Sequence, residues 1–181
     1  MLETVLIILA GAVVVIAILC VMVALQPAEF KLSRSTTIAA PPAESFAQVN
    51  DFHHWDSWSP WAKLDPSMKT TFDGPPAGEG AVYSWSGNNK VGEGRMTLIT
   101  SKPAELIRIT LEFFRPWKAT NLTEFTFQPE GQGTRVTWTM TGTNNFMAKA
   151  FHLIMNMEKL VGPDFEKGLA QLKAVVEQAK K

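Results

Sequence analysis

The sequence predicts an α+β fold, in which an antiparallel sheet packs on one long C-terminal helix and is preceded by one transmembrane helix. Three observations predict it. An uncharged, aliphatic run occupies residues 4–25. Short segments with apolar side chains at every second position follow between residues 68 and 142, separated by turn residues. Apolar residues then recur at helical spacing from Phe151 to Val176.

The run from Thr4 to Leu25 has the length of a membrane-spanning helix, since it would rise about 33 Å against a hydrocarbon core of about 30 Å. A cleaved signal peptide is the alternative. No basic residue precedes the run, and Ala24–Pro27 fits a cleavage site poorly, so we expect a retained anchor. Lys31 and Arg34 follow it, and the positive-inside rule therefore places the C-terminal domain in the cytoplasm. We expect a single-pass protein of a bacterial inner membrane.

We expect residues 1–29 to form the anchor and a short linker, and residues 30–181 to form one domain, because the chain is too short for two ordinary ones. Two of the 17 acidic residues, Glu3 and Glu29, precede residue 30, so the domain carries a net charge of only +2. A net charge this small does not indicate nucleic-acid binding, which is typical of strongly basic domains. The single cysteine, Cys20, lies in the apolar run and excludes a disulfide scaffold or cysteine zinc site in the domain. We expect no cofactor.

The elements of the domain follow in order. β-branched residues predict a strand from Phe30 to Ile38. Pro41 and Pro42 end this strand and open a helix through Val49, because a proline in the first helical turn loses no hydrogen bond. Residues 50–66 are rich in aromatic side chains and contain two prolines, which predicts a short helix and a structured loop.

Six further strands are predicted, and their short connections make neighbouring strands antiparallel. They are Met68–Asp73, Ala81–Ser86, Gly92–Ser101, Glu105–Phe114, Ala119–Gln128 and Thr134–Gly142. Alternation gives the sheet one apolar face, formed by Tyr83, Trp85, Ile107, Ile109, Leu111, Phe113, Phe125, Phe127, Val136, Trp138 and Met140. The last helix covers this face, and Gly162–Pro163 is expected to kink or interrupt it.

Five segments in this order resemble the START-related, Bet v 1-like proteins, especially the polyketide cyclase/dehydrase-like branch, also called SRPBCC. The segments are Phe52–Trp61, Gly80–Trp85, Gly92–Met96, Thr134–Trp138 and Gly162–Leu169. The resemblance covers residues 30–177. It implies a helix-grip fold, in which a curved sheet wraps around the C-terminal helix and encloses a cavity for a hydrophobic or amphipathic ligand.

The candidate residues of such a cavity are mainly aromatic, because large rings can line a pocket for an apolar guest. They are Trp55, Trp58, Trp61, Tyr83, Trp85, Ile109, Phe113, Phe125, Trp138 and Met155. For the first three, in the loop at the expected mouth, ligand binding and packing are both open. Trp138 is expected to be mainly a core residue. The apolar residues 146–157 either dip into the membrane surface, gate the cavity or are buried under the sheet, and we favour burial.

The remaining motifs do not indicate a metal site or a catalytic site. His53 and His54 lack the spacing of a metal site, and we expect a structural role and no bound metal. No hydrolase motif is present, so catalytic residues remain unassigned. Glu93 and Arg95 share one face of a strand and could act as an acid–cation pair, but a solvated face is the better interpretation.

Three functions remain. The leading hypothesis is a membrane-anchored binding protein for a hydrophobic or lipid-like small molecule, without firm catalytic activity. The second is a polyketide cyclase/dehydrase-like enzyme that uses acid–base catalysis in the same cavity, although the inward-facing residues offer few ionisable groups. The third is a sensor or assembly factor that acts through its surface. Protein partners are not predicted.

Overall fold

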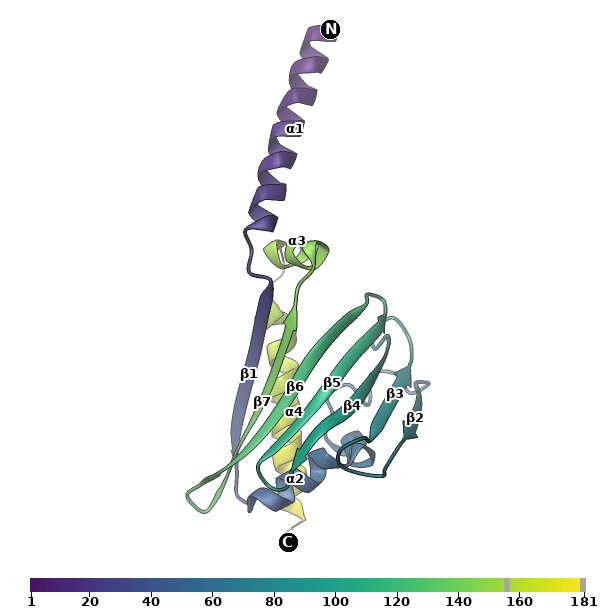
Figure 1. Cartoon of the computed structure of the whole chain (residues 1–181), viewed down its shortest axis with the longest axis vertical. Coiled ribbons are helices and arrows are strands. Elements are labelled where there is room, and N and C mark those ends of the chain that lie inside the picture. Colours follow the sequence, from purple (N-terminus) through teal and green to yellow (C-terminus); the bar gives the residue numbers. More distant parts are fainter. Residues whose placement is uncertain (155–156, 180–181) are drawn as a thin grey trace.

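Figure 1 shows the computed structural model, which describes residues 1–154 and 157–179. The helices are α1 (Leu2–Ala24), α2 (Pro42–Asn50), the 3-10 helix η1 (Phe52–Ser57), α3 (Phe146–Ile154) and α4 (Met157–Gln178). The strands are β1 (Glu29–Ile38), β2 (Lys69–Asp73), β3 (Val82–Ser86), β4 (Glu93–Lys102), β5 (Leu106–Arg115), β6 (Ala119–Glu130) and β7 (Gly133–Thr143). The predicted α+β fold is confirmed.

The seven strands form one antiparallel sheet in the order β1-β7-β6-β5-β4-β3-β2. Consecutive strands from β2 to β7 are therefore neighbours, and β1 joins the far edge beside β7. The sheet curves around α4, which lies behind β1 and β7 in Figure 1 and packs mainly against β1. This is the helix-grip arrangement that the resemblance implies.

The predicted apolar face of the sheet is its inner face. Most of its members are buried, namely Tyr83, Ile107, Ile109, Phe125, Phe127, Val136, Trp138 and Met140. Their outward neighbours Arg108 and Arg135 are exposed and pair with Glu124 and Glu130. Three predicted members of the apolar face, Trp85, Leu111 and Phe113, are only half-buried.

A stack of three rings joins the sheet to α4. Trp138 lies between Phe125, with ring centres 4.9 Å apart, and Phe165 of α4, with ring centres 4.0 Å apart. Phe165 is 1% exposed, so this contact is dry. Trp58 meets the edges of the stack, with its ring nearly perpendicular to both Phe125 and Trp138.

Of the two expected effects of Gly162–Pro163, an interruption of the helix is wrong, because both residues lie inside α4, and a kink stays a prediction. Arg34 of β1 explains how the helix continues. Its guanidinium binds Glu166 at 2.8 Å and Glu158 at 3.3 Å, which lie on either side of the Gly162–Pro163 step. A Cβ at Gly162 would lie 2.6 Å from Nη2 of Arg34, so glycine lets the guanidinium sit against the helix.

The apolar residues before α4 form the separate helix α3, and the expectation of burial is wrong for those whose side chains the structure describes. Phe146, Met147 and Phe151 are 50%, 74% and 47% exposed. The reason is that α3 leaves the sheet and packs against α1 instead (Figure 1).

Helix α1 is the one helix in the described part of the chain that is long and apolar enough to cross a membrane. Its mean hydropathy reaches 3.3, and Val23 is its one buried residue. A membrane anchor and a signal sequence both have these properties. The division into an anchor of residues 1–29 and a domain of residues 30–181 stays a prediction.

We expect Phe165→Ala to lower the free energy of unfolding by about 3–5 kcal/mol, because it removes a fully buried ring from the stack with Trp138. Phe114→Ala is the matched control, since Phe114 is 40% exposed on the outer face, and its effect should be about 1 kcal/mol or less. Urea unfolding of the whole chain in detergent micelles, followed by tryptophan fluorescence, measures both. Equal losses would contradict the assigned importance of the stack.

Candidate aromatic cavity

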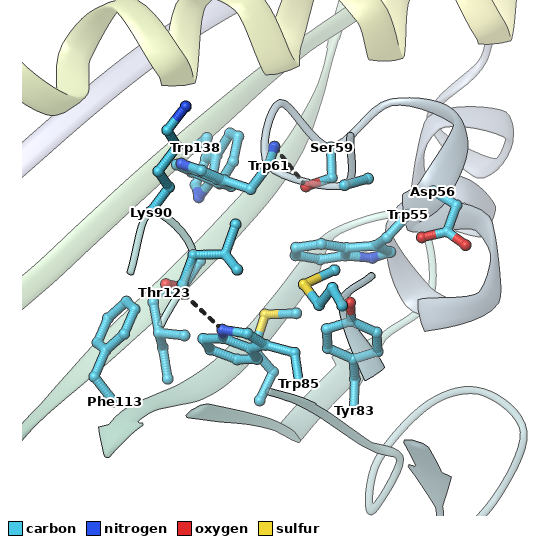
Figure 2. A pocket seen from close by; sticks show the side chains of 15 residues that line it. Trp55, Asp56, Ser59, Trp61, Tyr83, Trp85, Lys90, Phe113, Thr123 and Trp138 are labelled. Atoms are coloured by element: carbon cyan, nitrogen blue, oxygen red, sulfur yellow. Dashed lines mark hydrogen bonds between the residues drawn. The ribbon is translucent and has the colours of Figure 1, made fainter. Parts of the chain in front are cut away.

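A cavity of about 190 Å³ lies between the inner face of β3, β4 and β5 and the loop that contains η1. Figure 2 shows Tyr83 and Trp85 on one side of it and Trp55 and Trp61 across from them. Its lining consists of Trp55, Asp56, Ser59, Trp61, Ala62, Met68, Tyr83, Trp85, Lys90, Val91, Met96, Leu111, Phe113, Thr123 and Trp138. The half-burial of Trp85, Leu111 and Phe113 has its explanation here, because these residues face the cavity.

Six of the ten residues predicted from the sequence line the cavity, namely Trp55, Trp61, Tyr83, Trp85, Phe113 and Trp138. Trp58, Ile109 and Phe125 do not line it; each is 0% exposed and belongs to the packed core. Met155 lies outside the residues that the structure describes.

The loop that carries Trp55 is fastened to the end of α2. Asp51 caps η1, because its Oδ1 accepts a hydrogen bond from the backbone N–H of His53 at 2.9 Å. The indole of Trp55 donates to the carbonyl of Val49 at 3.0 Å, and Trp58 donates to the carbonyl of Gln48 at 3.1 Å. These bonds hold the ring of Trp55 over the cavity.

On the opposite wall, the indole of Trp85 is held by a hydrogen bond from its N–H and by a ring contact. Its N–H donates to the carbonyl of Val91 at 2.9 Å, and its ring meets Phe113 edge-on with ring centres 5.8 Å apart. Gly94 lies beneath the ring, where a Cβ would come within 2.5 Å of it. The absence of a side chain at Gly94 therefore lets the indole lie flat along β4.

Asp65 joins the two walls. Its Oδ1 accepts from the backbone N–H and hydroxyl of Ser67, and its Oδ2 accepts from the backbone N–H of Asn88 at 2.7 Å. These bonds, led by the Ser67 hydroxyl, lower the pKa of Asp65, so the carboxylate stays charged. A Cβ at Gly87 would lie 2.7 Å from Oδ2, so glycine is needed for this approach. The link positions the β3–β4 connection that carries Lys90.

Two hydroxyl groups on the lining, those of Tyr83 and Thr123, make no hydrogen bond to any residue that the structure describes. Burial raises the pKa of Tyr83 to about 12, and the negative charge of Asp56 adds to the effect. Tyr83 is therefore a neutral phenol at physiological pH and can donate a hydrogen bond. The indole N–H of Trp138 is buried and also lacks an acceptor among the described residues.

Nine lining residues were not among the predicted candidates. Met96, Leu111 and Thr123 lie on the inner face of strands, so the alternation of side chains could have found them. Asp56 comes from the short helix η1, and the other five, Ser59, Ala62, Met68, Lys90 and Val91, come from loops, where no periodicity exists. Asp56 and Lys90 are exposed and lie on opposite sides of the cavity in Figure 2.

Glu93 and Arg95 lie on the outer face, as the preferred interpretation predicted. Arg95 binds Glu112 at 2.8 Å, and Glu93 binds Arg115 at 2.8 Å, so neither takes part in the cavity. His53 has structural contacts: its ring nitrogen lies 2.7 Å from Asp51, and its ring stacks on Phe72. No group of three or more metal-ligating side chains gathers within the described part of the chain.

Comparison with protein families shows to which family the chain belongs. Residues 29–177 match the family described as polyketide cyclase/dehydrase and lipid transport. The chain belongs to this family. Among curated proteins, no sequence matches the chain significantly. The family match covers the sheet, the cavity and α4, and it begins where α1 and its linker end.

Solved structures share the fold of this polyketide cyclase/dehydrase family member. Protein CV1439 from Chromobacterium violaceum is 18% identical with a TM-score of 0.58, and the match covers 84% of this chain and 99% of that one. Aha1 from Colwellia psychrerythraea is 14% identical with a TM-score of 0.60, over 84% and 99%. Ara h 8.0201 is 12% identical with a TM-score of 0.55, over 83% and 99%. These likenesses show the Bet v 1-like fold alone.

We expect Tyr83, the only tyrosine of the chain, to ionise near pH 12 in the folded protein and near pH 10 in urea. Because the unfolded chain releases this proton first, folding stability should fall as the pH rises from about 10 to 12. Asp56→Asn should lower the pKa of Tyr83 modestly, since burial is the main cause. Phenolate absorbance measures the ionisation, and tryptophan fluorescence reports folding in the same samples. Equal titration in both states would contradict the buried phenol.

Proposed function

We propose that the protein is a membrane-anchored binding protein that holds a hydrophobic or lipid-like small molecule in the aromatic cavity. The observation that carries this proposal is the cavity wall of Trp55, Trp61, Trp85 and Phe113. The indole N–H groups of Trp55 and Trp85 are already bonded to backbone carbonyls, so these side chains offer a guest apolar ring surface.

The size and polarity of the cavity indicate an amphipathic guest. Its volume of about 190 Å³ is below the roughly 300 Å³ at which common ligand pockets begin, so it suits a small molecule or one end of a larger one. Inside, the hydroxyls of Tyr83 and Thr123 are available for one polar group of the guest. A polar end would project past Asp56 and Lys90 toward water. Met68 and Met96 can adjust to different shapes.

Membrane anchoring brings such a cavity close to molecules that are dissolved in the membrane. In this proposal α1 is retained and crosses the membrane once, which keeps the cavity close to the bilayer. Tethering raises the effective concentration of the binding site near molecules dissolved in the membrane. The family description, which includes lipid transport, supports a guest of this kind. The positive-inside rule favours the cytoplasmic side of a bacterial inner membrane for the domain.

A second candidate is an enzyme that cyclises or dehydrates a polyketide-like substrate. Two observations favour it: the family description names this chemistry, and Asp56, Tyr83 and Lys90 place three ionisable groups on the cavity wall. In this alternative the exposed carboxylate of Asp56 accepts a proton, while the neutral phenol of Tyr83 donates a hydrogen bond to a carbonyl oxygen of the substrate.

Cross-linking in cells tests the binding function. We expect a photoreactive phenylalanine analogue at position 113, on the cavity wall, to capture a discrete hydrophobic molecule that mass spectrometry identifies. Position 114 is the matched control, because Phe114 is the next residue of β5 and packs on the outer face beside Arg95. The analogue at position 114 should capture none.

Leu111→Trp should fill the cavity and reduce capture at position 113 at least several-fold, with circular dichroism confirming that the variant folds. Capture of the same molecules at both positions, or of none at position 113, would contradict the proposed function. The second result would direct attention to a surface function, such as that of a sensor or assembly factor.

The catalytic alternative makes a different prediction. If poly-β-keto model compounds are turned over, Asp56→Asn should lower kcat by about 10²- to 10⁴-fold, the usual contribution of a general base. Glu124→Gln, on the outer face where Glu124 pairs with Arg108, should leave kcat unchanged. Absence of turnover by the unmodified protein, or equal rates for the Asp56→Asn variant, would contradict a catalytic role for Asp56.

A further inference from the structure

Helix α3 is held at the point where α1 joins the rest of the protein. The backbone N–H of Asn144 donates to the carbonyl of Ala28 at 2.6 Å, so the segment that enters α3 is tied to the linker that leaves α1. Asn145 then caps α3, because its Oδ1 accepts from the backbone N–H of Ala148 at 2.9 Å. With only residues 25–28 between α1 and β1, the height of α3 relative to the end of α1 is fixed by the backbone.

The second feature of α3 is its orientation relative to α1. Figure 1 shows α3 lying crosswise at the end of α1, and the two helices are in contact; Val23, close to that end, is the one buried residue of α1. Phe146, Met147 and Phe151 nevertheless remain about half or more exposed. Three large apolar side chains on one short helix form an exposed patch that a water-facing surface does not favour.

A second exposed aromatic group lies at the same end of the sheet. Asn121 of β6 pairs with Gly142 of β7, and Gly142 pairs with Phe30 at the start of β1. The β5–β6 connection, just before Asn121, therefore lies at the end of the sheet from which the chain leads to α1 (Figure 1). In this connection Trp117 is 80% exposed, and the exposed Lys118 follows it.

We propose that these residues rest in the membrane–water interface and that their partner is the lipid bilayer surface. We call Trp117, Lys118, Phe146, Met147 and Phe151 the α1-side surface. The inference rests on the proposed anchoring of α1. A helix that crosses the bilayer steeply places a crosswise helix at its end in the plane of the interface, where an apolar face is buried about 5–10 Å deep. Trp and Lys favour this level, because their apolar bodies enter the acyl region while their polar tips stay hydrated.

The α1-side surface also places the cavity. Arg115, at the end of β5 near Trp117, donates from Nη2 to the carbonyl of Gly87 at 3.3 Å. This bond joins the β5–β6 end to the β3–β4 connection, whose Lys90 and Val91 line the cavity. Docking of the α1-side surface therefore holds the rim at Lys90 close to the bilayer, and a hydrophobic guest has a short path between membrane and cavity.

Spin labels in the whole chain test this inference. In a Cys20→Ser background, single nitroxides are attached through Met147→Cys on α3, Gln132→Cys at the β6–β7 turn and Val14→Cys in α1. The chains are reconstituted in phosphatidylethanolamine and phosphatidylglycerol vesicles. We expect the nitroxides at positions 147 and 14 to collide several-fold more with oxygen than with a water-soluble nickel reagent. Gln132 is the matched control, because it is also exposed but lies at the opposite end of the sheet, and its label should collide more with the nickel reagent than with oxygen.

The outcomes separate the inference from the proposed function. A label at position 147 that is as accessible to nickel as the label at position 132, with position 14 in lipid, would overturn the inference and leave the anchor intact. A nickel-accessible label at position 14 would overturn the anchor and the inference together. A label at position 147 that is shielded from both reagents would mean that a protein covers α3. This result would also overturn the inference of a membrane-facing surface.

Discussion

The stacking of Trp138 between Phe125 and Phe165 is the contact on which the other features depend. It joins the inner face of the sheet to α4, and its central ring, Trp138, also lines the cavity. The arrangement carries a cost, because the indole N–H of Trp138 is buried without an acceptor among the described residues, a penalty of about 1–3 kcal/mol. The dispersion and burial of three large rings outweigh it.

The cavity exists because its aromatic walls are held apart. Trp55 is bonded to the end of α2, and Trp85 is bonded to the β3–β4 connection, so neither ring can turn inward and fill the space. Gly94 lets the ring of Trp85 lie flat, and Asp65 keeps the two loops at a fixed separation. In the proposed binding function, a cavity maintained in this way needs little ordering of side chains when a ligand binds.

The two ends of the sheet differ in character. At one end, α1, α3 and the β5–β6 connection present apolar side chains, including Trp117 and Met147. At the other end, the β6–β7 turn contains Glu130, which pairs with Arg135 and accepts a hydrogen bond from Thr37. This difference between the two ends fits the proposed position of the domain beside a bilayer, in which one end meets lipid and the other meets water.

The sequence by itself determined the elements, their order and the buried face of the sheet. Those features depend on local periodicity, which is why the inner positions from Ile107 to Met140 could be read directly from the alternation of side chains. It also identified six of the cavity residues: four are aromatic residues on the inward face of strands, and Trp55 and Trp61 belong to the aromatic segment that follows α2.

Only the tertiary structure decided three matters, each of which depends on contacts between distant residues. Arg34 of β1 pairs with residues on both sides of Gly162–Pro163, and this step lies inside a continuous α4, where the local sequence predicted a kink or an interruption. Packing against α1 rather than the sheet left α3 exposed. Asp56 of η1 and the loop residue Lys90 line the cavity at positions that no periodic pattern encodes, whereas Trp58 and Ile109 belong to the core.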